Sequence, residues 1–223
     1  MLNSIMLGST VFSLLIANAF ELQKKERWID LLADNSLASW HLYLGAEIKG
    51  WKIDDGVLST SGKNGDIVTN QEFENFELEL EWKIEEGGNS GIFIFVVEHP
   101  DNKRMYQSGP EFQIIDNENY PQQLTEQQKT GSMSDVLAPS KSRSKPAGQW
   151  NKTRIVAHNG KVQHWLNKSL ILEYQIGSKQ LNEEIARSKF AQLRYAKVAK
   201  GKIGLQDHGN PVCFKNIRVR PIK

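Results

Sequence analysis

The chain has 223 residues, which is enough for one domain with a full hydrophobic core and does not require two. Its hydrophobic share of 39%, charged share of 24% and net charge of +2 are ordinary for a globular protein. Lysine and glutamate are interspersed, so the sequence has no basic stripe and favours no nucleic-acid partner. The single cysteine, Cys213, excludes an intrachain disulfide.

The first 19 residues contain no charged side chain. An apolar run from Ile5 to Ile16 leads into Ala17-Asn18-Ala19, which has the small-residue pattern of a secretory cleavage site. We therefore predict a signal peptide at 1–19 and a single domain over 20–223. The alternative is an uncleaved membrane anchor, for which the apolar run is short. The expected location is the periplasm or the outside of the cell, with no stable membrane span after cleavage.

Short strands are the main pattern in the rest of the chain. Strands are expected at 51–53 and 57–59, on either side of a turn. Residues 76–84 alternate apolar and charged, which predicts a strand with one wet face. The continuous apolar run 91–97 predicts a central strand covered on both faces, and 111–115 alternates again.

The second half of the chain continues the strand pattern. Residues 153–157 and 162–166 are expected to form a hairpin, with Asn159-Gly160 as its turn signal. Two further strands are expected at 202–205 and 214–219.

Helix signals are sparse. A short helix is expected within 182–190 and a turn within 124–128. The least regular stretch, 117–149, is too long for a plain connection, which predicts a functional loop or a mobile lid. Many short strands separated by glycine and asparagine favour an all-β sandwich or jelly roll.

The segment from Glu111 to Asp116 could carry chemistry. In a strand, Glu111 and Gln113 share one face and Asp116 falls on the other. A β-bulge near Ile114 and Ile115 would return Asp116 to the face of Glu111. Two carboxylates and an amide side by side would suit acid and base catalysis or metal coordination. The alternative is that Asp116 only starts a turn.

A second candidate is the stretch Gln206-Asp207-His208, which follows a strand. His208 is the best general-base candidate because imidazole titrates near neutral pH, although a histidine that only caps a turn would have the same context. The glycine-rich run 87–91 would let the backbone approach a ligand, or form a plain hairpin turn. The other histidines lack pairing at metal-ligand spacing and are expected to be structural or exposed.

Several short motifs then occur in a fixed order: NSGIF (89–93), GPEFQIIDN (109–117), PAGQWN (146–151), HWLN (164–167), SKF (188–190), GKIGLQDHG (201–209) and FKNIR (214–218). Over about residues 27–221 the chain resembles the 3-keto-disaccharide hydrolase domain family, which includes 3-keto-glucoside 1,2-lyases and 3-keto-2-hydroxyglucal hydratases. The resemblance implies a concanavalin A-like lectin/glucanase jelly roll of two antiparallel sheets and an exported enzyme of bacterial carbohydrate metabolism. One departure bears on substrate choice. Ser134 stands where the family pattern has a tyrosine.

The chemistry that the resemblance implies is an elimination. A ketone at C3 acidifies the proton on C2, a base removes this proton, the enolate expels the glycosidic oxygen from C1, and hydration of the glycal completes a net hydrolysis. The expected roles are His208 as base, Glu111 as alternative base or acid, and Lys189 or a bound cation as enolate stabiliser. The residues expected to bind sugar hydroxyls or to orient the catalytic groups are Asn89, Gln113, Asp116, Asp135 and Gln206. The one cofactor expected is a divalent metal ion held by Glu111, Asp116 and His208.

Two other functions remain open on the sequence. The same fold could carry a non-catalytic sugar-binding module, because fold does not determine function. A retaining glycosidase of the laminarinase type could use Glu111 and Asp116 as carboxylates about 5 Å apart, but His208 would have no role there. All three interpretations expect a small saccharide as the partner.

Overall fold

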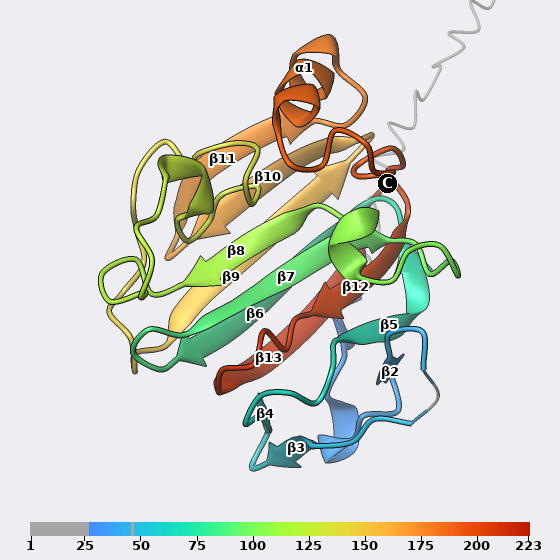
Figure 1. The fold of residues 1–223 in the computed structure, drawn as a ribbon. Helices are drawn as coiled ribbons and strands as arrows, with labels where there is room; N and C mark the ends of the chain where they lie inside the picture. The colour runs from blue at the N-terminus through green and yellow to red at the C-terminus, as the bar shows by residue number, and fades with distance from the viewer. Residues whose placement is uncertain (1–26, 46) are drawn as a thin grey trace, which may run out of the picture.

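Two antiparallel sheets packed face to face make up the protein (Figure 1). The computed structural model describes residues 27–45 and 47–223, so the predicted signal peptide lies outside the described residues. Within these ranges no helix is long and apolar enough to cross a membrane.

The larger sheet has eight strands in the described residues, in the order β11-β10-β9-β6-β13-β4-β3, with β1 paired to β13. Its strands are β1 (Ile29–Asp30), β3 (Trp51–Asp54), β4 (Val57–Thr60), β6 (Phe76–Ile84), β9 (Asn151–His158), β10 (Lys161–Leu166), β11 (Ser169–Gln175) and β13 (Val212–Pro221). The predicted hairpin is confirmed, because β9 and β10 pair across Asn159 and Gly160.

The smaller sheet has the order β2-β5-β12-β7-β8. Its strands are β2 (Trp40–Leu42), β5 (Ile67–Phe73), β7 (Asn89–Val96), β8 (Glu111–Ile115) and β12 (Gly201–Leu205). Every residue of β7 is buried, which confirms the prediction of a central strand covered on both faces.

Helical turns are short, as the sequence predicts. The described helices are η1 (Ala33–Asn35), η2 (Met105–Gln107), η3 (Glu126–Gln128) and α1 (Lys179–Arg187). The helix α1 begins before the expected position because the Ser178 side chain caps it by accepting a hydrogen bond from the backbone N–H of Leu181. It lies beside the β11 end of the larger sheet (Figure 1).

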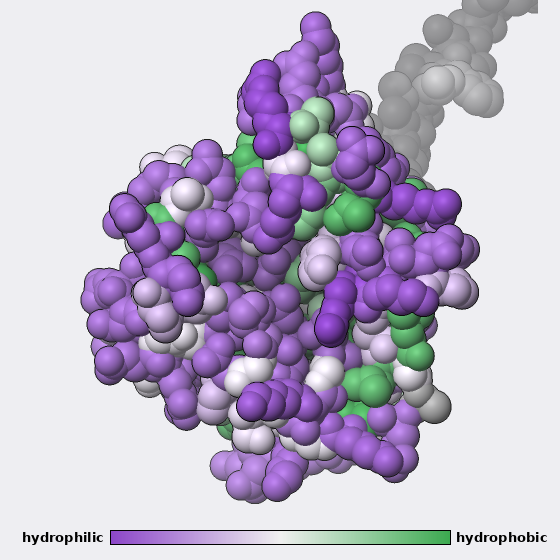
Figure 2. Space-filling view, viewed as in Figure 1, coloured by the Kyte–Doolittle hydropathy of each residue, from purple (hydrophilic) through white to green (hydrophobic). Residues whose placement is uncertain are grey.

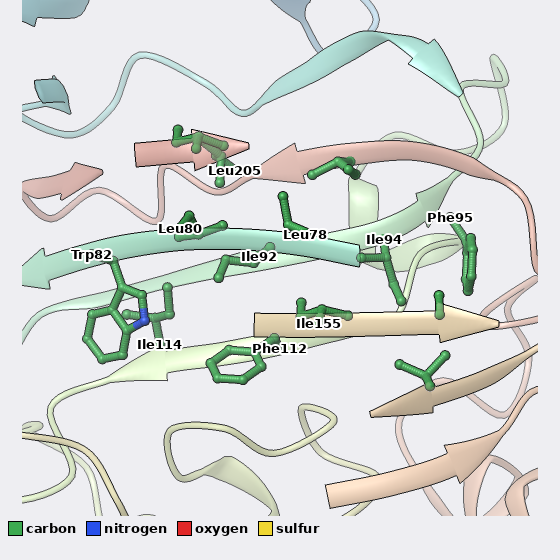
Figure 3. Packing of buried hydrophobic residues seen from close by; sticks show 14 of the residues in the cluster. Leu78, Leu80, Trp82, Ile92, Ile94, Phe95, Phe112, Ile114, Ile155 and Leu205 are labelled. Atoms are coloured by element: carbon green, nitrogen blue, oxygen red, sulfur yellow. The ribbon is translucent and has the colours of Figure 1, made fainter. Parts of the chain in front are cut away.

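The core lies between the sheets. Alternate residues of β6, β7 and β8 meet there, among them Leu80, Ile92 and Phe112 (Figure 3). Full burial of each such side chain contributes about 1.5–3 kcal/mol. The opposite residues of β7 and β8 therefore point to the outer face of the smaller sheet.

The predicted bulge in β8 is wrong. Strands β7 and β8 pair in unbroken register from Asn89 opposite Ile115 to Phe93 opposite Glu111. The pairing of β7 with β12 shifts instead, and Phe95 has a left-handed φ of 55°. The extra residue in β7 lets Ile94 and Phe95 both enter the core.

Candidate functional site

A cavity of about 400 Å³ opens on the outer face of the smaller sheet. This volume lies within the range of about 300–1,000 Å³ that ligand sites usually have. Hydrophilic residues cover most of the face seen in Figure 2. Strands β7 and β8, the turn η2, the long stretch 117–149, the segment after α1 and the loop after β12 all contribute to the lining. The lining includes Asn89, Tyr106, Glu111, Gln113, Tyr120, Asp135, Lys189, Phe190, Gln206 and His208.

The Glu111 carboxyl occupies a gap that Gly91 leaves in the neighbouring strand. A Cβ atom at Gly91 would lie 2.2 Å from Glu111 Oε1, so a side chain there would displace the carboxyl. Burial raises the pKa of Glu111 to about 8, although a hydrogen bond with Ser134 and the charge of Lys189 act in the opposite direction. Glu111 is therefore mainly protonated near pH 7 and is a proton donor in the resting site.

Side-chain amides form the floor beside this carboxyl. Gln113 stands opposite Gly91 in the β7–β8 pair, and the backbone N–H of Gln206 donates to Gly91 O at 3.0 Å. Gln113 Nε2 donates to Asn89 Oδ1, and Asn89 Nδ2 donates to the Tyr120 hydroxyl, both over long distances of 3.4 Å. Because these hydrogen bonds are weak, the amides have capacity left for ligand hydroxyls.

His208 lies at the exposed rim of the cavity on a fixed loop. The Asp207 carboxylate accepts hydrogen bonds from the Thr60 hydroxyl at 2.9 Å and from the backbone N–H groups of Lys63 and Asn64 at 2.8 Å. Partial desolvation and the charge of Lys189 lower the pKa of His208. Its imidazole is therefore neutral near pH 7, as a general base must be.

Lys189 connects two sides of the site. Its ammonium group forms an ion pair with Asp135, and Asp135 Oδ1 also accepts from Gln128 Nε2 at 2.8 Å. The segment after α1 is thus tied to the long stretch 117–149, which lines one side of the cavity. The structure brings together seven of the eight residues that the sequence singled out.

Asp116 is the exception. Its carboxylate accepts hydrogen bonds from the backbone N–H of Gly87 at 3.0 Å, from Glu118 at 3.1 Å, and from the backbone and side chain of Asn119 at 3.3 and 3.0 Å. Burial alone would raise the pKa of Asp116, but these hydrogen bonds lower it. Without the bulge Asp116 stays off the Glu111 face, so it organises a turn outside the cavity lining. The expected role of Asp116 in the site is therefore corrected.

The expected metal ligands consequently do not meet. Glu111 and His208 line the cavity, whereas Asp116 faces the turn. Across the part of the chain that the structure describes, no group of three or more His, Cys, Asp or Glu side chains is placed to hold a metal ion.

Sequence reasoning missed the aromatic lining residues Tyr106, Tyr120 and Phe190. They come from loops and short helical turns, where no periodicity shows which way a side chain points. The one available signal was the length of the irregular stretch 117–149, which holds Tyr120.

The sequence matches a known protein family. Residues 27–220 match the family described as the 3-keto-alpha-glucoside-1,2-lyase-like domain. The chain belongs to this family. It is 34% identical over 201 residues to the 3-keto-disaccharide hydrolase of Bacteroides thetaiotaomicron, and the match covers 76% of this chain and 69% of that protein.

Solved structures share the fold. A crystal structure from Parabacteroides distasonis, of a protein proposed to be a glycosyl hydrolase, is 33% identical with a TM-score of 0.84 and covers 88% of this chain and 94% of that chain. A Bacillus subtilis protein with a galectin-like fold is 16% identical with a TM-score of 0.54, and covers 87% of this chain and 94% of that chain. The second likeness concerns the fold alone, and the predicted lectin-like jelly roll of two antiparallel sheets is confirmed.

Proposed function

We propose that this chain is a carbohydrate-active enzyme that cleaves 3-keto-glycosides by removing the proton on C2 and expelling the glycosidic oxygen from C1, or that hydrates the resulting glycal. Membership of the family and the name of the Bacteroides relative support action on a keto-sugar. The observation that carries the proposal is the pairing, in one cavity, of a neutral imidazole at His208 with a protonated buried carboxyl at Glu111.

The first step is the loss of the C2 proton. The neutral His208 ring takes this proton, and the electron pair of the broken C–H bond moves towards the ketone at C3 to form an enolate. Amide N–H groups of Asn89 and Gln113 and the ammonium group of Lys189 are positioned in the same cavity to offset the negative charge. Asp135 holds Lys189 in place.

The second step breaks the C1–O bond. The enolate electrons form the C1–C2 double bond, and the glycosidic oxygen leaves with the proton of Glu111. A donor with a pKa of about 8 suits this task, because it is still protonated near neutral pH and gives its proton to a developing alkoxide.

Hydration of the glycal uses the same two groups in the reverse direction. The Glu111 carboxylate takes a proton from water as the oxygen attacks C1, and the protonated His208 returns a proton to C2. Elimination and hydration together give net hydrolysis, and both residues return to their starting protonation states.

The two rival functions have less support. A retaining glycosidase would need the carboxylate of Asp116 beside Glu111, and Asp116 instead holds the turn at Gly87. A sugar-binding module needs no acid and base, so the convergence of Glu111 and His208 favours an enzyme. A divalent cation stays a proposal without an assembled ligand set, and no step above depends on it.

Export also stays a proposal. The apolar leader at 1–19 supports a periplasmic or secreted protein. Cell fractionation with N-terminal sequencing tests it. An intact Met1 on the cytoplasmic protein would contradict it.

The decisive assay compares methyl 3-keto-α-glucoside with ordinary methyl α-glucoside, with and without a chelator, in ²H₂O followed by NMR. We expect turnover of the keto-sugar alone and deuterium at C2 of the hydrolysed product. Cleavage of the ordinary glucoside alone would defeat the proposal. Loss of keto-sugar turnover with the chelator, restored by a divalent ion, would establish a metal requirement.

Matched variants assign the residues. His208→Ala and Glu111→Gln should each lower kcat by about 10²–10⁴-fold. The controls are His158→Ala and Glu118→Gln, which change an exposed histidine and an exposed glutamate outside the cavity lining. Full activity in both His208→Ala and Glu111→Gln would show that the assignment is wrong.

A further inference from the structure

One wall of the cavity is aromatic. Phe190 stacks on Tyr195 with ring centroids 4.1 Å apart and an angle of 11° between the planes. Tyr106 tilts against Phe190 at 6.2 Å and 43°. Both Tyr106 and Phe190 line the cavity that also contains the amides of Gln113 and Asn89. An aromatic wall and hydrogen-bonding amides in one cavity suit a sugar, which has apolar C–H faces and polar edges.

Tyr106 is the exposed residue of this aromatic wall. Its exposed fraction is 39%, whereas that of Phe190 is 1%. Of the large hydrophobic side chains exposed in the described ranges, Tyr106 is the aromatic one. Because Tyr106 also lines the cavity, its exposed surface is available for contact with a ligand there.

The backbone around Tyr106 is held firmly. The neighbouring Met105 is 1% exposed and fills a gap at Gly204, where a Cβ atom would lie 2.4 Å from Met105 Sδ. The backbone N–H of Ala196 donates to Ser108 O at 2.8 Å, which ties η2 to the segment that carries Tyr195. A backbone fixed before binding loses little conformational entropy when a ligand stacks on the side chain that it carries.

Depth in the cavity separates the two parts of a substrate. Glu111 and Gln113 are each only 6% exposed, so the reacting sugar would enter deeply to meet them. Tyr106 is 39% exposed, so it is the more accessible side chain, and the group bonded to C1 would extend towards it. We propose that Tyr106 is the stacking platform for this leaving group, and that it makes the enzyme prefer a second sugar ring or an aryl group over a small alkyl group. The inference rests on the proposed function for the identity of the deep sugar.

The kinetic test compares 4-nitrophenyl with methyl 3-keto-α-glucoside. Tyr106→Ala should lower the aryl-to-methyl ratio of kcat/KM by about 3- to 10-fold, and Tyr106→Trp should restore it. Trp165→Ala is the matched control, because Trp165 is a partly buried aromatic residue that packs on Arg154 and does not line the cavity. An unchanged ratio in Tyr106→Ala, or an equal fall in Trp165→Ala, would overturn the inference.

A binding arm separates this inference from the proposed function. If the wild-type protein turns over neither keto-glycoside, the proposed cleavage fails, and titration calorimetry with ordinary 4-nitrophenyl and methyl α-glucosides still tests the platform. Weaker binding of the aryl glucoside alone in Tyr106→Ala supports the stacking role. Equal affinity of wild type and variant for the aryl glucoside contradicts it.

Discussion

Glutamates on the outer faces of the two sheets have opposite environments. On the larger sheet, Glu79 forms ion pairs with Lys152 at 3.1 Å and Arg218 at 2.7 Å. Burial alone would raise the pKa of Glu79, but these cations hold it below its usual value. On the smaller sheet, Glu111 has no ion pair among the described contacts, and burial raises its pKa to about 8. The difference teaches that a carboxylate in a strand is structural where cations face it across the sheet and reactive where it is buried without them.

The largest expected effect is on the pH dependence of stability. The folded state binds the Glu111 proton more tightly than the unfolded state, so this stabilisation is complete below about pH 4.5 and is lost as the pH rises through about 8. Glu111→Gln should remove this loss, which is on the order of 4 kcal/mol by pH 9. Urea unfolding at pH 5, 7 and 9 measures it. Identical pH curves for wild type and variant would refute the raised pKa.

Gly91→Ala should have the next largest effect. The added methyl group needs the space of the Glu111 carboxyl, so the carboxyl moves towards water and its pKa falls. We expect a loss of about 10²-fold in kcat and a shift of the alkaline limb of the pH–rate profile to lower pH. Gly204→Ala is the control, because its methyl group meets the Met105 sulfur and not Glu111. The same shift of the alkaline limb in both variants would mean that the space at Gly91 does not set the pKa of Glu111.

Asp116→Asn should reduce stability more than activity. An amide has one acceptor oxygen where the carboxylate has two, so hydrogen bonds to Gly87 and Asn119 are weakened. The expected cost is about 1–2 kcal/mol of unfolding free energy, measured by urea denaturation, with kcat/KM near the wild-type value at temperatures where the variant is folded. If Asp116→Asn is folded but inactive, Asp116 has a role in the function of the site and the correction above is wrong.

The smallest expected effect is the change in stability when Glu79 of the larger sheet is replaced. Glu79→Gln should cost less than about 1 kcal/mol, because the ion pairs to Arg218 and Lys152 are partly solvated. The loss should shrink further in 1 M salt, where charges are screened. Thermal unfolding at low and high salt measures it. A loss of activity in Glu79→Gln would contradict the conclusion that Glu79 is structural and Glu111 reactive.

Local periodicity accounts for what the sequence predicted correctly. Alternation over 76–84 and 111–115 predicted β6 and β8 and placed Glu111 and Gln113 on one face, because successive strand residues point to opposite sides. Strands β1, β2, β5 and β11 were missed. In β5 the alternation is interrupted, since three consecutive residues from Asn70 to Glu72 are exposed.

The site contained residues that the sequence could name but not place. Lys189, Asp135 and His208 were expected near Glu111, and that expectation came from resemblance to a family and not from spacing. Asp116 was misplaced because a bulge shifts the face of a residue by one position and leaves no signal in residue types.

The sequence by itself determined most of the strands, the face that carries Glu111 and the family. Tertiary structure alone decided that the bulge lies in β7, that the Glu111 carboxyl fills the gap at Gly91, and that Lys189 meets Asp135. The physical reason is the range of each interaction. Side-chain alternation is a property of neighbouring residues, whereas burial, and with it the pKa of Glu111, depends on segments that only the packed sheets and loops bring together.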